Sequence, residues 1–263
     1  MIHFSLHVSS QSWIIFQHES INDSVLFFFF IVAYNFSHRG FINMTNKNIL
    51  TNNLTIHQSK HDHRFSLDSL ILAQNIFPKK KCRILELGCG CGIISIMIAR
   101  KFPDAHIIGI DILKTAVDIA RQNVRINGVS DRVTILERDL RTLKGDSFER
   151  FQYIVCNPPF RKEKSGRPNV TYEKLIAREE IACTLNEILA ISRKLLVDRG
   201  ELSLIYPVGR IAELMVQMCS FKITPTDLIP VYTKQNHPAK WSVVKGRLNS
   251  RNELRIHAPL YPT

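Results

Sequence analysis

The 263-residue sequence lacks a hydrophobic run of the length that a membrane span requires. Its most apolar run, Val25 to Tyr34, falls well short of the roughly 20 residues that a spanning helix needs. No Lys or Arg precedes the run, whereas a secretory signal begins with positive charge. The six cysteines show neither paired zinc spacing nor a disulfide framework, which indicates a reducing compartment. The sequence therefore predicts a cytoplasmic protein with no metal and no membrane contact.

Acidic residues are also few. There are 23 Asp and Glu against 35 Lys and Arg, and the formal net charge is +12. Such an excess suggests a polyanionic partner, although solubility alone would explain part of it. A hydrophobic content of 45% and a charged content of 22% are ordinary for a globular protein, so disorder of the whole chain is excluded.

Residues 1–43 differ in composition from the rest of the chain. They hold 8 of the 15 Phe and 4 of the 10 His, but their only charged residues are Glu19, Asp23 and Arg39. Met44 then opens a stretch of ordinary polar content. We expect residues 1–43 to be extraneous translation, with the working domain covering 44–263. A membrane-associating leader is the alternative.

From residue 64 onward, short apolar runs alternate with helical patterns. The expected strands are Arg83–Leu87, Ala105–Ile110, Arg132–Leu136, Tyr153–Cys156 and Glu201–Tyr206, with two or three more near Leu228–Tyr232, Trp241–Gly246 and Glu253–His257. The expected helices are Ser66–Phe77, Gly92–Phe102, Leu113–Asn127, Tyr172–Leu196 and Gly209–Cys219. This alternation predicts a doubly wound α/β fold with a mostly parallel, seven-stranded sheet and an antiparallel edge strand.

A glycine-rich turn, Glu86-Leu87-Gly88-Cys89-Gly90-Cys91-Gly92, joins an expected strand to an expected helix. Glycines in such a turn let the backbone approach a ligand that a Cβ atom would repel. The G-x-G-x-x-G spacing of dinucleotide-binding folds fails in both registers, because its third position falls on Ile93 or Ser95. The acidic-x-G-x-G-x-G pattern instead resembles the cofactor loop of class I S-adenosylmethionine-dependent methyltransferases.

Acidic residues follow the next two strands. Asp111 ends the second strand, where a carboxylate can accept both hydroxyls of a ribose, and Asp139 follows the third, where it can accept from an adenine amino group. Ligands of open α/β sheets lie at such strand ends. We therefore expect S-adenosylmethionine to contact Glu86, Gly88, Gly90, Gly92, Asp111, Ile112, Asp139, Leu140 and Asn157. The plain alternative is a tight turn beside two solvated acids.

The tetrapeptide Asn157-Pro158-Pro159-Phe160 ends the fourth strand. Its prolines have no N–H and a fixed φ, so the Pro158 carbonyl is left unpaired and rigidly aimed. The Asn157 side-chain oxygen and this carbonyl can together accept both hydrogens of an NH2 group, while Phe160 offers a flat face for stacking. The tetrapeptide is similar to the signature of methyltransferases that act on planar nitrogens. We take Asn157, Pro158 and Phe160 as the candidate catalytic residues.

From His63 to Leu260 the chain resembles the bacterial valine-tRNA adenine N6-methyltransferases. The resemblance includes the His63–Asp68 segment, both motifs above, Gly166-Arg167, Gly200-Glu201-Leu202 and Pro238-Ala239-Lys240. It implies methylation of the adenine 3′ to a tRNA anticodon, and it places Arg64, Phe65 and Asp68 near the methionine end of the cofactor. Glu179 stands where the family usually has His, which puts any role of that His in doubt.

Cations gather after the tetrapeptide and in the C-terminal part. We expect RNA phosphates to contact Arg161, Lys162, Lys164, Arg167 and Lys240, because phosphate contacts bring affinity without sequence information. The tail also carries Lys234, Lys245, Arg247, Arg251 and Arg255 against Glu253 alone. A solvated basic face is the alternative.

Three other functions stay open. Protein glutamine N5-methylation uses the same tetrapeptide, but those enzymes carry a helical domain ahead of the glycine loop, and residues 44–80 leave room for about one helix. Guanine N2-methylation of ribosomal RNA fits the motif equally well. A catalytically silent RNA-binding protein on the same fold is the third, and the intact motifs count against it. The oligomeric state does not follow from the sequence.

Overall fold

The computed structural model describes residues 54–58, 67–146, 148–158 and 183–262. The predicted leader lies outside these residues. Within them, no helix has the length and apolar character needed to cross a membrane.

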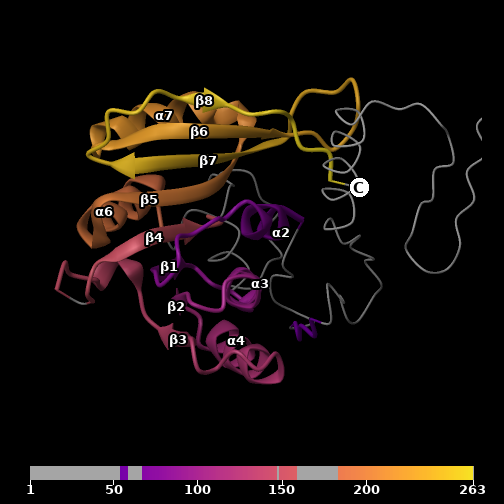
Figure 1. The fold of residues 1–263 in the computed structure, drawn as a ribbon, viewed down its shortest axis with the longest axis vertical. Helices are drawn as coiled ribbons and strands as arrows, with labels where there is room; N and C mark the ends of the chain where they lie inside the picture. Colours follow the sequence, from indigo (N-terminus) through magenta and orange to yellow (C-terminus); the bar gives the residue numbers. More distant parts are fainter. Residues whose placement is uncertain (1–53, 59–66, 147, 159–182, 263) are drawn as a thin grey trace, which may run out of the picture. The chain divides into compact units, whose positions relative to one another are not determined.

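Eight strands form one sheet in the order β3-β2-β1-β4-β5-β7-β6-β8 (Figure 1). The strands are β1 (Arg83–Leu87), β2 (His106–Asp111), β3 (Val133–Glu137), β4 (Phe151–Cys156), β5 (Leu196–Pro207), β6 (Ile223–Val231), β7 (Trp241–Leu248) and β8 (Arg255–Ile256). Those from β3 to β5 run parallel, and β7 is antiparallel to both β5 and β6. The mostly parallel sheet with an antiparallel edge is confirmed. It has one strand more than the seven predicted, because the two-residue β8 pairs with β6.

Helices cover both faces of the sheet (Figure 1). The helices α2 (Leu67–Gln74), α3 (Ile93–Lys101) and α4 (Lys114–Ile126) bury their apolar residues in one core cluster, and α6 (Leu185–Leu195) and α7 (Ile211–Ser220) bury theirs in a second. Neighbouring strand residues alternate between the two clusters: Ile84 lies in the first and Leu85 in the second. A strand buried on both faces needs an almost continuous apolar run, which is why the central strands were recognisable in the sequence.

The predicted helix Tyr172–Leu196 is wrong as one continuous element. Thr184 has an extended backbone (φ −89°, ψ 161°), and α6 begins after it. The Thr184 hydroxyl accepts from the Glu187 N–H while the Glu187 carboxylate accepts from the Thr184 N–H, which is a capping box. The sequence pattern T-x-x-E at this position signalled the helix start, and residues 172–182 lie outside the described part.

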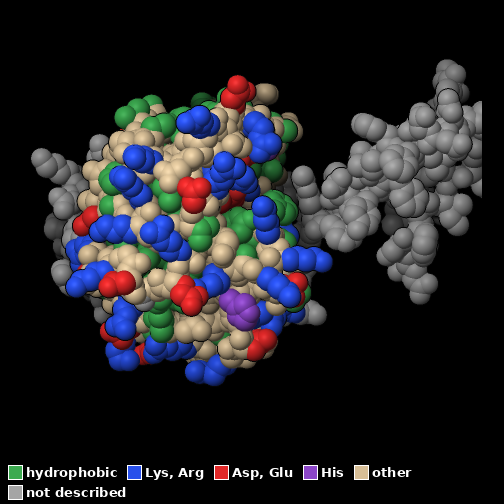
Figure 2. All heavy atoms as spheres, turned by 60° about the vertical axis from the view of Figure 1, so that its left-hand side comes forward, with side chains coloured by type: hydrophobic (Ala, Val, Ile, Leu, Met, Phe, Trp, Pro, Cys, Tyr) green, Lys and Arg blue, Asp and Glu red, His purple; other side chains and the backbone are tan. Residues whose placement is uncertain are grey.

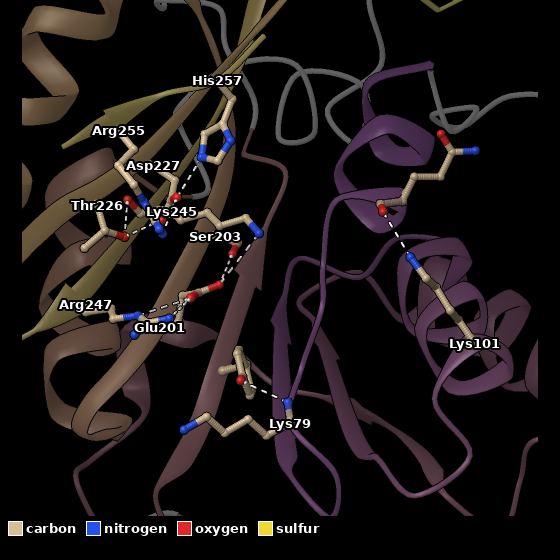
Figure 3. Close-up of polar contacts among 12 residues, drawn as sticks. Lys79, Lys101, Glu201, Ser203, Thr226, Asp227, Lys245, Arg247, Arg255 and His257 are labelled. Carbon is tan, nitrogen blue, oxygen red and sulfur yellow. Dashed lines mark hydrogen bonds and ion pairs between the residues drawn. The ribbon is translucent and has the colours of Figure 1, made fainter. Parts of the chain in front are cut away.

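Buried acids hold the antiparallel half of the sheet together. Glu201 of β5 faces Lys245 and Arg247 of the adjacent β7, with the Arg247 Nη2 atom 3.1 Å from its Oε2 (Figure 3). Asp227 of β6 likewise binds Arg255 at 2.9 Å and His257 at 2.7 Å, which ties β8 to the sheet edge (Figure 3). Three of the basic tail residues are thus ion-paired within the fold, so their charge is partly neutralised before any partner binds.

Candidate active site

The predicted site residues follow strand ends that lie side by side. Leu87 of β1 is the register partner of Cys156 in β4 on one side and of Ile110 in β2 on the other. Strands β2 and β3 are added on one side of β1, and β4 and β5 on the other. Open α/β sheets bind ligands at the point between β1 and β4 where the direction of strand addition changes. The glycine loop, Asp111 and Asn157 therefore leave the sheet at one place, as the sequence predicted.

The glycine loop has a backbone that only glycine adopts readily. Gly88, Gly90 and Gly92 have φ angles of 70°, 51° and 82°, in the left-handed region. A Cβ atom on Gly88 or Gly90 would meet no atom of the described residues within 4 Å, so the backbone there is open toward a ligand. A Cβ on Gly92 would lie 3.3 Å from the Ala120 Cβ, so this glycine lets α3 approach α4 closely.

Asp111 fixes the shape of this loop. One carboxylate oxygen accepts from the Gly90 N–H at 2.8 Å and the other accepts from the Leu113 N–H at 2.9 Å. Burial raises the pKa of the Asp111 carboxyl above its usual value, against the lowering effect of these two N–H groups. Each oxygen keeps a further lone pair, so the carboxylate still has room to accept hydroxyl donors of a ligand.

Glu86 lies beneath the loop rather than on its open side. Its side chain is 2% exposed, and its Oε2 atom accepts from the Ser95 backbone N–H at 2.9 Å and from the Ser95 hydroxyl. Burial raises the pKa of the Glu86 carboxyl to about 8, so the acid is largely protonated at neutral pH. The residue joins the end of β1 to the first turn of α3.

Asn157 presents an acceptor at the end of β4. Its Nδ2 atom donates to the Ser69 hydroxyl of α2 at 2.9 Å, and its side chain also hydrogen-bonds Asp68. Its Oδ1 atom is buried and has no hydrogen-bond partner within the described structure. Pro158 beside it is buried. A buried carbonyl oxygen without a donor is rare in a folded protein, and it points to an absent ligand or water.

Asp139 already has a partner. Its carboxylate binds the Arg141 guanidinium through both oxygens, the shortest distance being 2.7 Å, and caps a short 3-10 helix that starts at Leu140. The Arg141 hydrogen bonds hold the pKa of Asp139 below its usual value. An adenine amino group would therefore share this carboxylate with Arg141.

The structure also describes the two apolar residues predicted to contact the cofactor. Ile112 is 37% exposed beside Asp111, and Leu140 is partly buried against the second core cluster.

Asn123 of α4 and Asn127, the residue that caps its C-terminal end, make contacts that the sequence did not predict. Asn123 is fully buried; it accepts from the His57 N–H at 2.8 Å and donates to the carbonyls of His57 and Cys91, each at 2.9 Å. Asn127 binds the N–H and the carbonyl of Thr55 in the same way. The two side-chain amides thus bond the backbone N–H and carbonyl groups of Thr55 and His57, as a neighbouring β-strand would. Asn123 also bonds the backbone of the glycine loop at Cys91. In the sequence, the signal for these contacts was the pair of asparagines spaced four residues apart, next to the apolar stripe of α4.

The two cysteines of the loop lie inside the fold. Cys89 and Cys91 are buried, and burial raises the pKa of the Cys91 thiol to about 12, so it does not ionise near neutral pH. Among the described residues, no three His, Cys, Asp or Glu side chains gather as metal ligands would.

Of the predicted RNA contacts, the structure describes Lys240. This exposed lysine precedes β7 and has its Nζ atom 4.2 Å from the centre of the Trp241 ring. Burial raises the pKa of the Asp68 carboxyl, and the charge of Lys240 partly opposes that rise. Charged side chains on the face shown in Figure 2 are mostly Lys and Arg. The other predicted RNA contacts, Arg161, Lys162, Lys164 and Arg167, lie outside the described residues. So do Arg64 and Phe65, which were expected near the cofactor, and Phe160, which was expected to stack on the target base.

The comparisons with known proteins agree with this geometry. The family model described as "Methyltransferase small domain" matches residues 59–208, more than half of the chain. The chain belongs to this family. The matched range includes the glycine loop, Asp111, Asp139 and Asn157.

The chain is also similar to individual proteins and to solved structures. A Porphyromonas gingivalis protein named tRNA1(Val) (adenine(37)-N6)-methyltransferase is 33% identical over 154 residues, 57% of this chain and 59% of that protein. A Vibrio campbellii protein of the same name is 31% identical over 59% of this chain and 63% of its own length. The matches thus span about three fifths of these relatives. The crystal structure of an Agrobacterium tumefaciens protein described as a predicted O-methyltransferase superposes with a TM-score of 0.59 at 21% identity, over 74% of this chain and 87% of that one, and shows the shared fold.

The residues present fit the S-adenosylmethionine that this family implies. Three features lie at the carboxyl ends of the adjacent strands β1, β2 and β4. They are the open backbone at Gly88 and Gly90, the spare lone pairs of Asp111, and the Asn157 Oδ1 atom, which has no partner among the described residues. Together they offer a surface for a polar ligand and an acceptor beside it.

Proposed function

We propose that this protein methylates an exocyclic amino nitrogen of a base in RNA, with adenine N6 of a tRNA anticodon loop as the target. The bound cofactor would supply a methyl group on a sulfonium, which is activated enough that no general base is needed. The protein's own part is then positioning and charge placement.

The observation that carries the proposal is the unpaired, buried Asn157 Oδ1 atom at the end of β4. An amino group has two hydrogens to donate, and Oδ1 with the Pro158 carbonyl would accept both. These bonds draw electron density toward the nitrogen and turn its lone pair toward the methyl group. Phe160 would stack on the base, and Asp111 and the glycine loop would hold the cofactor.

RNA is favoured over a protein amide by charge and by the relatives. The net charge of +12 suits a polyanion, and the proteins from P. gingivalis and V. campbellii are named for a tRNA substrate. The charge of Lys240 acts on Asp68, whose carboxyl hydrogen-bonds the Asn157 side chain. An enzyme of tRNA would work in the cytoplasm.

Transfer of a tritiated methyl group from S-adenosylmethionine tests the substrate class. Bulk tRNA lacking the modification, ribosomal RNA and a release factor would be offered in parallel to the wild type and to Asn157→Ala. We expect transfer to tRNA, with turnover lowered by about 10²-fold in Asn157→Ala and RNA affinity changed little. Label on the release factor alone would identify a glutamine methyltransferase. Wild-type turnover in Asn157→Ala would refute the acceptor role.

A further inference from the structure

Helix α2 contacts the Asn157 side chain although 88 residues separate Ser69 from it in the sequence. The Ser69 hydroxyl lies 2.9 Å from the Asn157 Nδ2 atom, and the Asp68 carboxyl shares a hydrogen bond with the same side chain. Asp68 and Ser69 are 6% and 7% exposed, so water has little access to replace either contact.

The two ends of a primary amide have nearly the same shape but opposite hydrogen-bonding character. The NH2 end donates and the oxygen end accepts. Burial raises the pKa of the Asp68 carboxyl, and the hydrogen bond with Asn157, which favours the ionised form, opposes that rise. In its ionised form the carboxylate can only accept, so Asp68 is then compatible with the NH2 end of Asn157 and repels the oxygen end. With the NH2 end held on α2, the Oδ1 atom is left as the free end of the amide, and among the described residues it has no hydrogen-bond partner.

The orientation decides whether the site can hold an amino group. A target NH2 is a donor and needs an acceptor opposite it. If the Asn157 amide were rotated by about 180° so that its oxygen and nitrogen exchanged places, it would offer its own NH2 to the substrate. Two donors would then face each other. Ser69 alone does not prevent this, because a hydroxyl donates as well as accepts.

We propose that Asp68, aided by Ser69, is a positioning residue that locks the Asn157 amide with its acceptor toward the target nitrogen. The inference rests on the proposed function, since the lock matters when the substrate group is a donor. It assigns to the start of α2 a role in the chemical step that is separate from holding the cofactor.

The test replaces the carboxylate by a group that both donates and accepts. Asp68→Asn should lower kcat at least tenfold and leave the KM for RNA within about twofold. In the Asn157→Ala background the same change should cost less than about twofold, because no amide remains to be oriented. Asn75→Ala is the matched control, since its Nδ2 donates to the Ile71 carbonyl at the other end of α2. It should keep wild-type kcat.

A swap of the two residues separates positioning from mere support of the fold. Asn157→Asp alone sets two carboxylates against each other and should be nearly inactive. Adding Asp68→Asn restores a donor on α2 and an acceptor on β4, and it should recover at least tenfold in kcat over that single variant. If the double variant is no better, or if Asp68→Asn costs equally with and without Asn157, Asp68 acts by another route and the inference is wrong.

A readout without RNA keeps the inference apart from the proposed function. In a 15N spectrum, the Asn157 side-chain NH2 signals, identified by their loss in Asn157→Ala, should exchange slowly in the wild type and at least tenfold faster in Asp68→Asn. Unchanged exchange in Asp68→Asn would overturn the lock. A wild type that shows the lock but methylates no RNA would instead refute the proposed function.

Discussion

Asn123 connects residues 54–58 to the glycine loop, so its removal should affect both stability and cofactor binding. Asn123→Ala deletes three hydrogen bonds, two to His57 and one to the Cys91 carbonyl. At about 1 kcal/mol for each bond, the free energy of unfolding should fall by about 3 kcal/mol. The bond to Cys91 is buried, so that carbonyl would be left without a partner.

Asn127→Ala, at the C-cap of the same helix, is the matched comparison. It deletes the two bonds to Thr55 and one to the Asn123 carbonyl but none to the glycine loop. Water reaches this side chain more easily, so we expect a loss of about 1–2 kcal/mol.

The assays are urea unfolding and calorimetric titration with S-adenosylhomocysteine. Asn123→Ala should weaken cofactor binding at least fivefold, and Asn127→Ala should change it less than about twofold. Equal effects of the two variants on binding would show that the bond to Cys91 does not shape the loop. A loss of under about 1 kcal/mol in Asn123→Ala would refute the energetic argument.

Further predictions concern the cofactor acid, the buried glutamate, the RNA surface and the leader. Asp111→Ala should weaken S-adenosylhomocysteine binding at least tenfold by calorimetry, since charge-assisted bonds contribute about 1.5–3 kcal/mol each; unchanged affinity would remove the ribose assignment. Glu86 has a folded pKa of about 8 against 4.5 unfolded, so its contribution to unfolding free energy should fall with rising pH between these values by about 1.4 kcal/mol per unit. Glu86→Gln should flatten that slope in urea melts at several pH values, and an unaltered slope would mean that the acid is ionised in the fold. Lys240→Ala should reduce the salt dependence of RNA binding by about one unit of slope in titrations at several salt concentrations; an unchanged slope would place this lysine outside the interface. A chain starting at Met44 should fold and bind cofactor undiminished, and aggregation would show that residues 1–43 belong to the domain.

The parallel half of the sheet followed from the sequence because its signals are local. Each central strand is a short apolar run closed by glycine, acid or proline, and β1 has the predicted bounds Arg83–Leu87. The β5 strand is longer than predicted, Leu196–Pro207, because its pairing with β4 shifts register between Phe151 and Tyr153. A bulge of this kind depends on the neighbouring strand and leaves no pattern in the sequence itself.

The sequence predicted which residues lie at the candidate site, but it did not predict their hydrogen-bond partners. Strand-end positions of Asp111 and Asn157 follow from motif spacing, since parallel strands end at one edge. The contacts of Ser69 with Asn157 and of Asn123 with His57 join positions 88 and 66 residues apart, and nothing in either local stretch signals them. The pairing of Arg247 with Glu201 was hidden for the same reason, which is why the basic tail looked more available than it is.

Nucleoside mass spectrometry tests the central claim most directly. An unmodified tRNA substrate would be incubated with the protein and S-adenosylmethionine carrying a deuterated methyl group, then digested to nucleosides. The account predicts deuterium-labelled N6-methyladenosine, formed by the wild type and lost in Asn157→Ala. Label in N2-methylguanosine would contradict the adenine target, and the absence of label from every nucleoside, with the cofactor bound, would contradict methylation of RNA.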